Sequence, residues 1–156
     1  MKNGLKVIIA VAAVILVIVG IVAGSYNSLV TAQTAVETKQ ADIQTQLQRR
    51  ADLIPNFVST VKGYTKYEQE TLTAVTEARA KVGSANSAQS LSEADEELDK
   101  AISVWVNAVT EAYPDLKANS NYIALQDELA GTENRIAVAR KDYNEAVQSY
   151  NAMIKK

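Results

Sequence analysis

Residues Leu5 to Gly24 read LKVIIAVAAVILVIVGIVAG and carry one charge, on Lys6. At about 1.5 Å of rise per residue, roughly 20 helical residues cross the ~30 Å hydrocarbon core of a bilayer. The run is longer than the apolar part of a cleaved signal peptide, about 7 to 15 residues, and it lacks an Ala-x-Ala ending. It therefore predicts an uncleaved signal anchor, with a cleaved secretory signal as the alternative. No second apolar run of this length follows, so we expect a single-pass protein.

Basic residues that flank the run predict the orientation of the chain. Lys2 and Lys6 lie at its start, whereas only Lys39 lies within about 20 residues after it. Because short cytoplasmic flanks are enriched in lysine and arginine, we expect the N-terminus in the cytoplasm and the rest outside the cell membrane. This predicts two parts. Residues 1–24 form a short basic N-terminus and the transmembrane anchor, and residues 25–156 form a helical bundle domain.

Composition argues against nucleic-acid binding and against most catalytic chemistry. The 16 basic and 18 acidic residues are scattered along the chain without a basic block, so nucleic acid is not an expected partner. The chain has no histidine and no cysteine, which excludes thiolate nucleophiles and the usual zinc ligands. We interpret the acidic residues between Glu93 and Asp99 as a solvated helix face. The protein is predicted not to be an enzyme, with no catalytic residue, cofactor or metal.

After the anchor, apolar residues recur three or four positions apart, which is typical of amphipathic helices. The first helix is expected to continue from the anchor to the stretch Arg49–Pro55. Pro55 lacks an amide hydrogen and disfavours helical geometry at the preceding residue, so a kink or tight corner is predicted there. A second helix is then expected to include Val58 and to end near Gly83.

The later part of the chain predicts two more helices. Ser90 and Glu93 have the spacing of a capping box, so the third helix is expected to begin around Ser90. A second corner is predicted over Pro114–Asn121, and the last helix then runs for more than 30 residues from Tyr122. Long helices joined by short loops predict an all-α fold, in which a single transmembrane helix continues into an elongated antiparallel up-and-down bundle.

Several motifs resemble those of the LemA family, a group of bacterial membrane-anchored helical proteins. The stretches that carry the resemblance are 46–56 (QLQRRADLIPN), 111–119 (EAYPDLKAN) and 132–136 (TENRI), together with Arg140. The resemblance implies one N-terminal transmembrane helix and a long antiparallel helical bundle, and it implies no established reaction, substrate or cofactor. Two features depart from the family: Gln40 stands where many relatives have tryptophan, and relatives usually continue beyond Lys156.

Two sets of polar residues are the candidates for functional or structural roles. Residues of the two predicted corners are interpreted first as structural groups, for example Asp52 near a helix start, and alternatively as a surface that binds a partner. Arg79 and Glu68 interrupt an apolar stripe and are candidates for buried polar groups. The candidate corner residues are Arg49, Arg50, Asp52, Asn56, Glu111, Tyr113, Lys117 and Asn119.

Small residues at the end of the anchor favour contact with another helix. Gly20 and Gly24 form a GxxxG motif, and Ser28 continues a ridge of small residues that lets a neighbouring helix approach closely. We therefore expect a membrane-embedded homo-oligomer that acts as a scaffold or interaction protein of the bacterial cell envelope. The alternative is a regulatory or sensory subunit that binds an envelope protein through the corner motifs, and an enzyme of unknown reaction ranks third.

Overall fold

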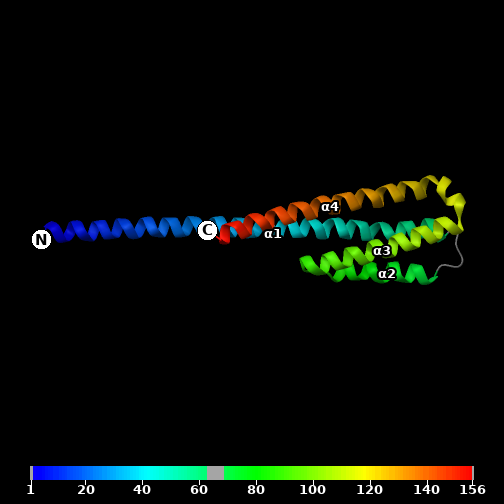
Figure 1. Cartoon of the computed structure of the whole chain (residues 1–156), viewed down its shortest axis with the longest axis horizontal. Coiled ribbons are helices and arrows are strands. Elements are labelled where there is room, and N and C mark those ends of the chain that lie inside the picture. The colour runs from blue at the N-terminus through cyan, green and yellow to red at the C-terminus, as the bar shows by residue number, and fades with distance from the viewer. Residues whose placement is uncertain (1, 63–68, 156) are drawn as a thin grey trace. The chain divides into compact units, whose positions relative to one another are not determined.

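The computed structural model describes residues 2–62 and 69–155, and all of its regular elements within these ranges are helices. Helix α1 spans Lys2–Lys62, α2 spans Gln69–Ser84, α3 spans Ala88–Ala112 and α4 spans Ser120–Ile154, with a short 3₁₀ helix, η1, at Pro114–Ala118 (Figure 1). The prediction of an all-α fold is therefore confirmed. The 35 residues of α4 also agree with the predicted length of the last helix.

The chain divides into two compact units, which we describe separately. The first, the two-helix unit, contains residues 1–38 and 144–156, and the second, the four-helix unit, contains residues 39–143. This division is based on contacts within the chain. The predicted boundary between residues 24 and 25 concerns the edge of the membrane and stays a prediction.

Within the four-helix unit, ion pairs reveal the directions of the helices. The Lys39 and Arg49 side chains of α1 contact Asp142 and Glu128 of α4, so these two helices run antiparallel. Helix α3 runs parallel to α1. Gln40 of α1 donates a hydrogen bond to the Asn86 carbonyl just before α3, and further along both helices Arg50 pairs with Asp95. Helix α2 packs alongside α3 and is joined to it by the short connection between Ser84 and Ala88. This is the up-and-down order that the sequence predicts.

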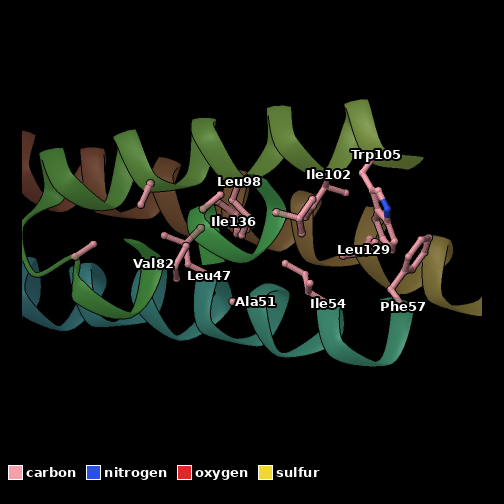
Figure 2. Close-up of a cluster of buried hydrophobic side chains, with 14 of the residues drawn as sticks. Leu47, Ala51, Ile54, Phe57, Val82, Leu98, Ile102, Trp105, Leu129 and Ile136 are labelled. Carbon is pink, nitrogen blue, oxygen red and sulfur yellow. The ribbon is translucent and has the colours of Figure 1, made fainter. Parts of the chain in front are cut away.

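The core of the four-helix unit lies between apolar stripes with three- and four-residue spacing (Figure 2). At one end of this core, the ring centroid of Phe57 lies 5.1 Å from those of both Trp105 and Tyr122. The Tyr122 hydroxyl lies 2.7 Å from the hydroxyl of Thr110, so this buried phenol has a hydrogen-bond partner. The stripe of α1 consists of Ile43, Leu47, Ala51, Ile54, Phe57 and Val61.

The predicted corner at Arg49–Pro55 is wrong, because α1 continues through Pro55 to Lys62. Proline at position 55 leaves the carbonyl of Ala51, four residues earlier, without its helical N–H donor. Arg79 of α2 supplies the missing hydrogen bond, because its Nε donates to the Ala51 oxygen at 3.0 Å. Val58, which was assigned to the second helix, therefore belongs to α1.

The start of α3 differs slightly from the prediction, whereas the second corner agrees with it. Ser87 is the N-cap, and its side chain accepts a hydrogen bond from the Ser90 amide while the Ser90 hydroxyl accepts one from the Ser87 amide. Ser90 is thus the last residue of the capping box, at the third position of the helix, and not its first. At the other end, α3 ends at Ala112 and η1 occupies most of the predicted corner.

The two-helix unit has no buried side chain among the residues whose burial is described. Its α1 portion contains a segment that is long and apolar enough to cross a membrane, as judged by length and composition. Eleven large apolar side chains between Ile8 and Val22 are 53% to 71% exposed. Further along α1, Leu29, Ala32 and Val36 are half-buried, as are Ala146, Val147 and Tyr150 of α4.

Candidate functional site: a buried arginine and carboxylate cluster

Arg50 of α1 is the centre of an ion cluster that joins three helices of the four-helix unit. Its side chain is 4% exposed. Its Nη1 lies 3.1 Å from Asp95 Oδ1 and 2.6 Å from Glu133 Oε2, and its Nη2 lies 2.6 Å from Asp99 Oδ1. The carboxylates come from α3 (Asp95 and Asp99) and from α4 (Glu133), so one guanidinium connects α1 to both helices.

Asp95 is the most buried acid of the cluster. Its second oxygen lies 2.8 Å from Nη2 of Arg140, which comes from α4. Burial raises the pKa of Asp95 above its ordinary value, and the Arg140 and Arg50 guanidinium groups oppose this shift. With Asp99 and Glu133 nearby, three carboxylates share two arginines, so the cluster carries one excess negative charge when fully ionised.

The geometry of this ion cluster fits a role in fixing how the helices pack better than a catalytic role. A buried ion pair gains little net stability, but its geometry fixes which residues of neighbouring helices face one another. The Nε of Arg50 is buried without a hydrogen-bond partner, so the guanidinium is held by its two terminal nitrogens alone. Across the described ranges, no group of three or more potential ligands is placed to hold a metal ion.

A second, more exposed ion pair lies one residue away in α1. Arg49 Nη2 lies 2.8 Å from Glu128 Oε1, and Arg135 approaches the same oxygen at 3.3 Å. The Arg49 side chain is 55% exposed, in contrast to that of Arg50. Two neighbouring arginines thus have similar partners and very different burial, which makes them a natural matched pair for mutagenesis.

The remaining candidates of the first predicted corner also contact their own chain. Asp52 Oδ1 accepts a hydrogen bond from Gln48 and lies 3.8 Å from Nη2 of Arg79. The Asn56 carbonyl accepts hydrogen bonds from the hydroxyls of two residues that follow it in α1. Arg79 itself is half-buried, and its Nε caps the Ala51 carbonyl as described above. Glu68 lies outside the described residues.

The candidates of the second corner mostly shape the connection between α3 and α4. Asn119 Oδ1 accepts hydrogen bonds from the amides of Asn121 and Tyr122, so it caps the start of α4. Tyr113 is half-buried between α3 and η1, and packs against the core. Glu111 and Lys117 are exposed at this end of the four-helix unit. A role of these residues in binding a partner remains a proposal.

The glycines of the anchor lie on an open surface. A Cβ atom built at Gly20 or Gly24 would meet nothing within 4 Å. The Ser28 hydroxyl donates to the carbonyl of Gly24 at 3.0 Å, which satisfies it within the helix. Packing inside the described chain therefore does not require glycine at either position, although the ridge borders a shallow groove between α1 and the end of α4.

Sequence reasoning missed the carboxylate partners of Arg50. Asp95 lies on the α3 stripe with Leu91, Leu98 and Ile102 and is buried, so the interpretation of the whole acidic stretch as a solvated face is wrong at this position. The position of Asp95 on the apolar stripe of α3 could have indicated its burial, because an acid in place of an apolar residue on a core stripe needs a partner. Glu133 and Arg140 lie in stretches that carry the LemA resemblance, but they are not among the candidate site residues predicted from the sequence.

The raised pKa of Asp95 predicts a specific pH dependence of stability. The folded chain holds the Asp95 proton at pH values where the unfolded chain has already lost it. The contribution of Asp95 to the free energy of unfolding therefore falls as the pH rises from about 3.8 through the pKa of Asp95 in the folded chain. We expect the free energy of unfolding of the wild type, relative to that of Asp95→Asn, to fall with rising pH across this window. Denaturant unfolding of both proteins at several pH values measures it. A difference that rises with pH would contradict the assignment.

Comparison with known proteins gives one family match and three curated relatives. The sequence model of the LemA family matches residues 39–156. Protein LemA of Metamycoplasma hominis is 29% identical over 132 residues, which cover 84% of this chain and 60% of the relative. Magnetosome proteins MamQ 1 and MamQ 2 of Paramagnetospirillum magneticum are each 24% identical over 156 residues, with 84% of this chain and 57% of the relative covered. The chain thus spans less than two thirds of the length of these relatives.

Proposed function

This chain belongs to the LemA family, and we propose that it is a non-enzymatic, membrane-anchored helical module of the bacterial cell envelope that assembles with copies of itself. Assembly occurs through the anchor and the adjoining part of α1. The names of the three relatives specify no enzymatic reaction, which supports the non-enzymatic part of the proposal. Its orientation has the N-terminus in the cytoplasm and the four-helix unit outside, as the flanking lysines predict.

The observation that carries the proposal is the open ridge at the end of the anchor. Glycine in a helix costs about 1 kcal/mol relative to alanine, and neither Gly20 nor Gly24 has a positive φ or a neighbour that would exclude a Cβ. Nothing inside the described chain requires glycine at these positions. Close approach of a second transmembrane helix would require it, because small residues allow helix backbones to approach in lipid.

The two-helix unit supports the same proposal outside the anchor. Its α1 and α4 portions hold apolar residues such as Leu29, Val36 and Val147 that are only half-buried. Two helices cannot enclose a core, whereas four helices can, as the other unit of this chain demonstrates. A second copy would supply the missing pair of helices.

The test replaces the small residues of the ridge by large ones. Gly20→Leu with Gly24→Leu should raise the dissociation constant of the oligomer about tenfold or more, equivalent to ~1.4 kcal/mol, because the bulky side chains separate the helices. Ile15→Leu with Val19→Leu is the matched control, with the same spacing on a face roughly 140° away around the helix. Single-molecule mass measurements of the full-length protein in nanodiscs provide the readout. An oligomer that persists unchanged in the glycine variant would refute the interface.

A further inference from the structure

We propose that the last turn of α4 forms a second membrane contact, in which Met153 and Ile154 lie in the boundary between acyl chains and headgroups beside the end of the anchor. The inference rests on the anchoring part of the proposed function and does not require self-assembly. Its partner is the phospholipid bilayer itself. The contact would hold α4, as well as α1, at the membrane surface.

The geometry within the two-helix unit places these residues at the correct depth. Met153 and Ile154 line a shallow groove together with α1 residues from Gly20 to Leu29. In Figure 1, the C-terminal end of α4, drawn in red, lies beside this part of α1. The apolar run of the anchor ends at Gly24, so the groove begins inside the last turn of the run and extends just beyond it.

Exposure shows that the chain itself does not cover this apolar surface. Met153 and Ile154 are 46% and 56% exposed, whereas Tyr150, one turn earlier in α4, is half-buried against its surroundings. Ile21 and Val22 in the same groove are exposed to a similar degree as the rest of the anchor. Hydrocarbon that covers Ile21 and Val22 would therefore reach Met153 and Ile154 as well, and about 25 cal/mol per Å² of apolar area favours that burial.

Residues next to the groove have the chemistry of a membrane interface. Tyr26 is exposed and follows the apolar run by two residues, and tyrosine is enriched at headgroup level because its ring is apolar and its hydroxyl polar. Lys155 is exposed directly after Ile154. A lysine at this place can lay its aliphatic stem along the apolar surface while its ammonium group reaches a lipid phosphate.

A labelling experiment distinguishes lipid from protein as the group that covers Met153. The chain has no cysteine, so Met153→Cys accepts a single environment-sensitive fluorophore in the full-length protein. The protein is placed in nanodiscs of phosphatidylcholine and phosphatidylglycerol that carry a quencher near the top of the acyl chain. Leu16→Cys is the control for the anchor and Val138→Cys, an exposed position of α4 in the four-helix unit, is the control for solvent.

The proposal predicts that lipid quenching at position 153 is several-fold stronger than at position 138. Quenching no stronger than at position 138 would overturn it. Protection from both the lipid quencher and an aqueous quencher would also overturn it, because the surface would then be covered by protein, for example a second copy. Absence of quenching at position 16 would instead refute the membrane anchor, and with it the proposed function.

A second measurement avoids the label. Met153→Asp with Ile154→Asp should increase amide hydrogen exchange over residues 144–154 several-fold in nanodiscs, because carboxylates expel the last turn from the apolar boundary. Val138→Asp is the matched control for the added charge. Equal exchange over 144–154 in the double variant and the wild type would contradict the membrane contact.

Discussion

Replacement of Arg50 by alanine should lower the free energy of unfolding by about 3–5 kcal/mol, the usual cost of removing one partner of a buried ion pair. The Arg50 guanidinium contacts three carboxylates, and Asp95 would keep only Arg140. The lost energy arises mainly because a buried negative charge is left undercompensated. Chemical unfolding of the full-length protein in detergent, followed by far-ultraviolet circular dichroism, measures the change.

Arg49→Ala is the matched control, because it removes the same side chain from the preceding position of the same helix. The Arg49 pair with Glu128 is largely exposed, and exposed pairs contribute about 0–1 kcal/mol. As the pH falls through the raised pKa of Asp95, the cost of Arg50→Ala should shrink, because the protonated Asp95 carboxyl group needs no cation. Equal losses for the two arginine variants at neutral pH would show that the cluster does not organise the unit.

Replacement of Arg79 by methionine should cost about 1–3 kcal/mol, because the carbonyl of Ala51, a residue that is 1% exposed, loses the donor that Arg79 supplies. The cost should depend on Pro55. In a Pro55→Ala background, the alanine amide can donate to the Ala51 carbonyl, so Arg79→Met should cost at least about 1 kcal/mol less. A double-mutant cycle over positions 55 and 79, measured by chemical unfolding, gives this coupling.

The cycle separates the carbonyl contact from the other contact of Arg79. The longer approach of Arg79 to Asp52 is present in both backgrounds and cancels. A coupling energy near zero would show that α1 tolerates Pro55 for another reason. In that case, the continuation of α1 past Pro55 would have no explanation in the contact with α2.

Local sequence patterns predicted the features that depend on one segment alone. The spacing of Tyr122, Leu129 and Ile136 predicted a long final helix, because a regular apolar stripe is sufficient to define the buried face of a helix. Leu5–Gly24 likewise predicted a helical segment that is long and apolar enough to cross a membrane. The second corner followed from Pro114, which begins η1 two residues after α3 ends at Ala112.

The sequence-based predictions were wrong where a side chain of one helix supplies the hydrogen bond or charge that a residue of another helix needs. Pro55 normally ends a helix, and the side chain of Arg79, 24 positions later, supplies a donor for the Ala51 carbonyl that Pro55 leaves without one. An aspartate normally indicates a solvated position. Asp95 is buried because Arg50 and Arg140, from other helices, compensate its charge. Such pairs become visible in the sequence only once the register of the helices is known.

The mass of the wild-type full-length protein in nanodiscs tests the central claim most directly. The open glycine ridge and the half-buried two-helix unit predict one discrete homo-oligomer, of at least two chains, at low protein concentration. A protein that stays monomeric at every concentration tested would contradict self-assembly and would favour a module that acts through a different partner.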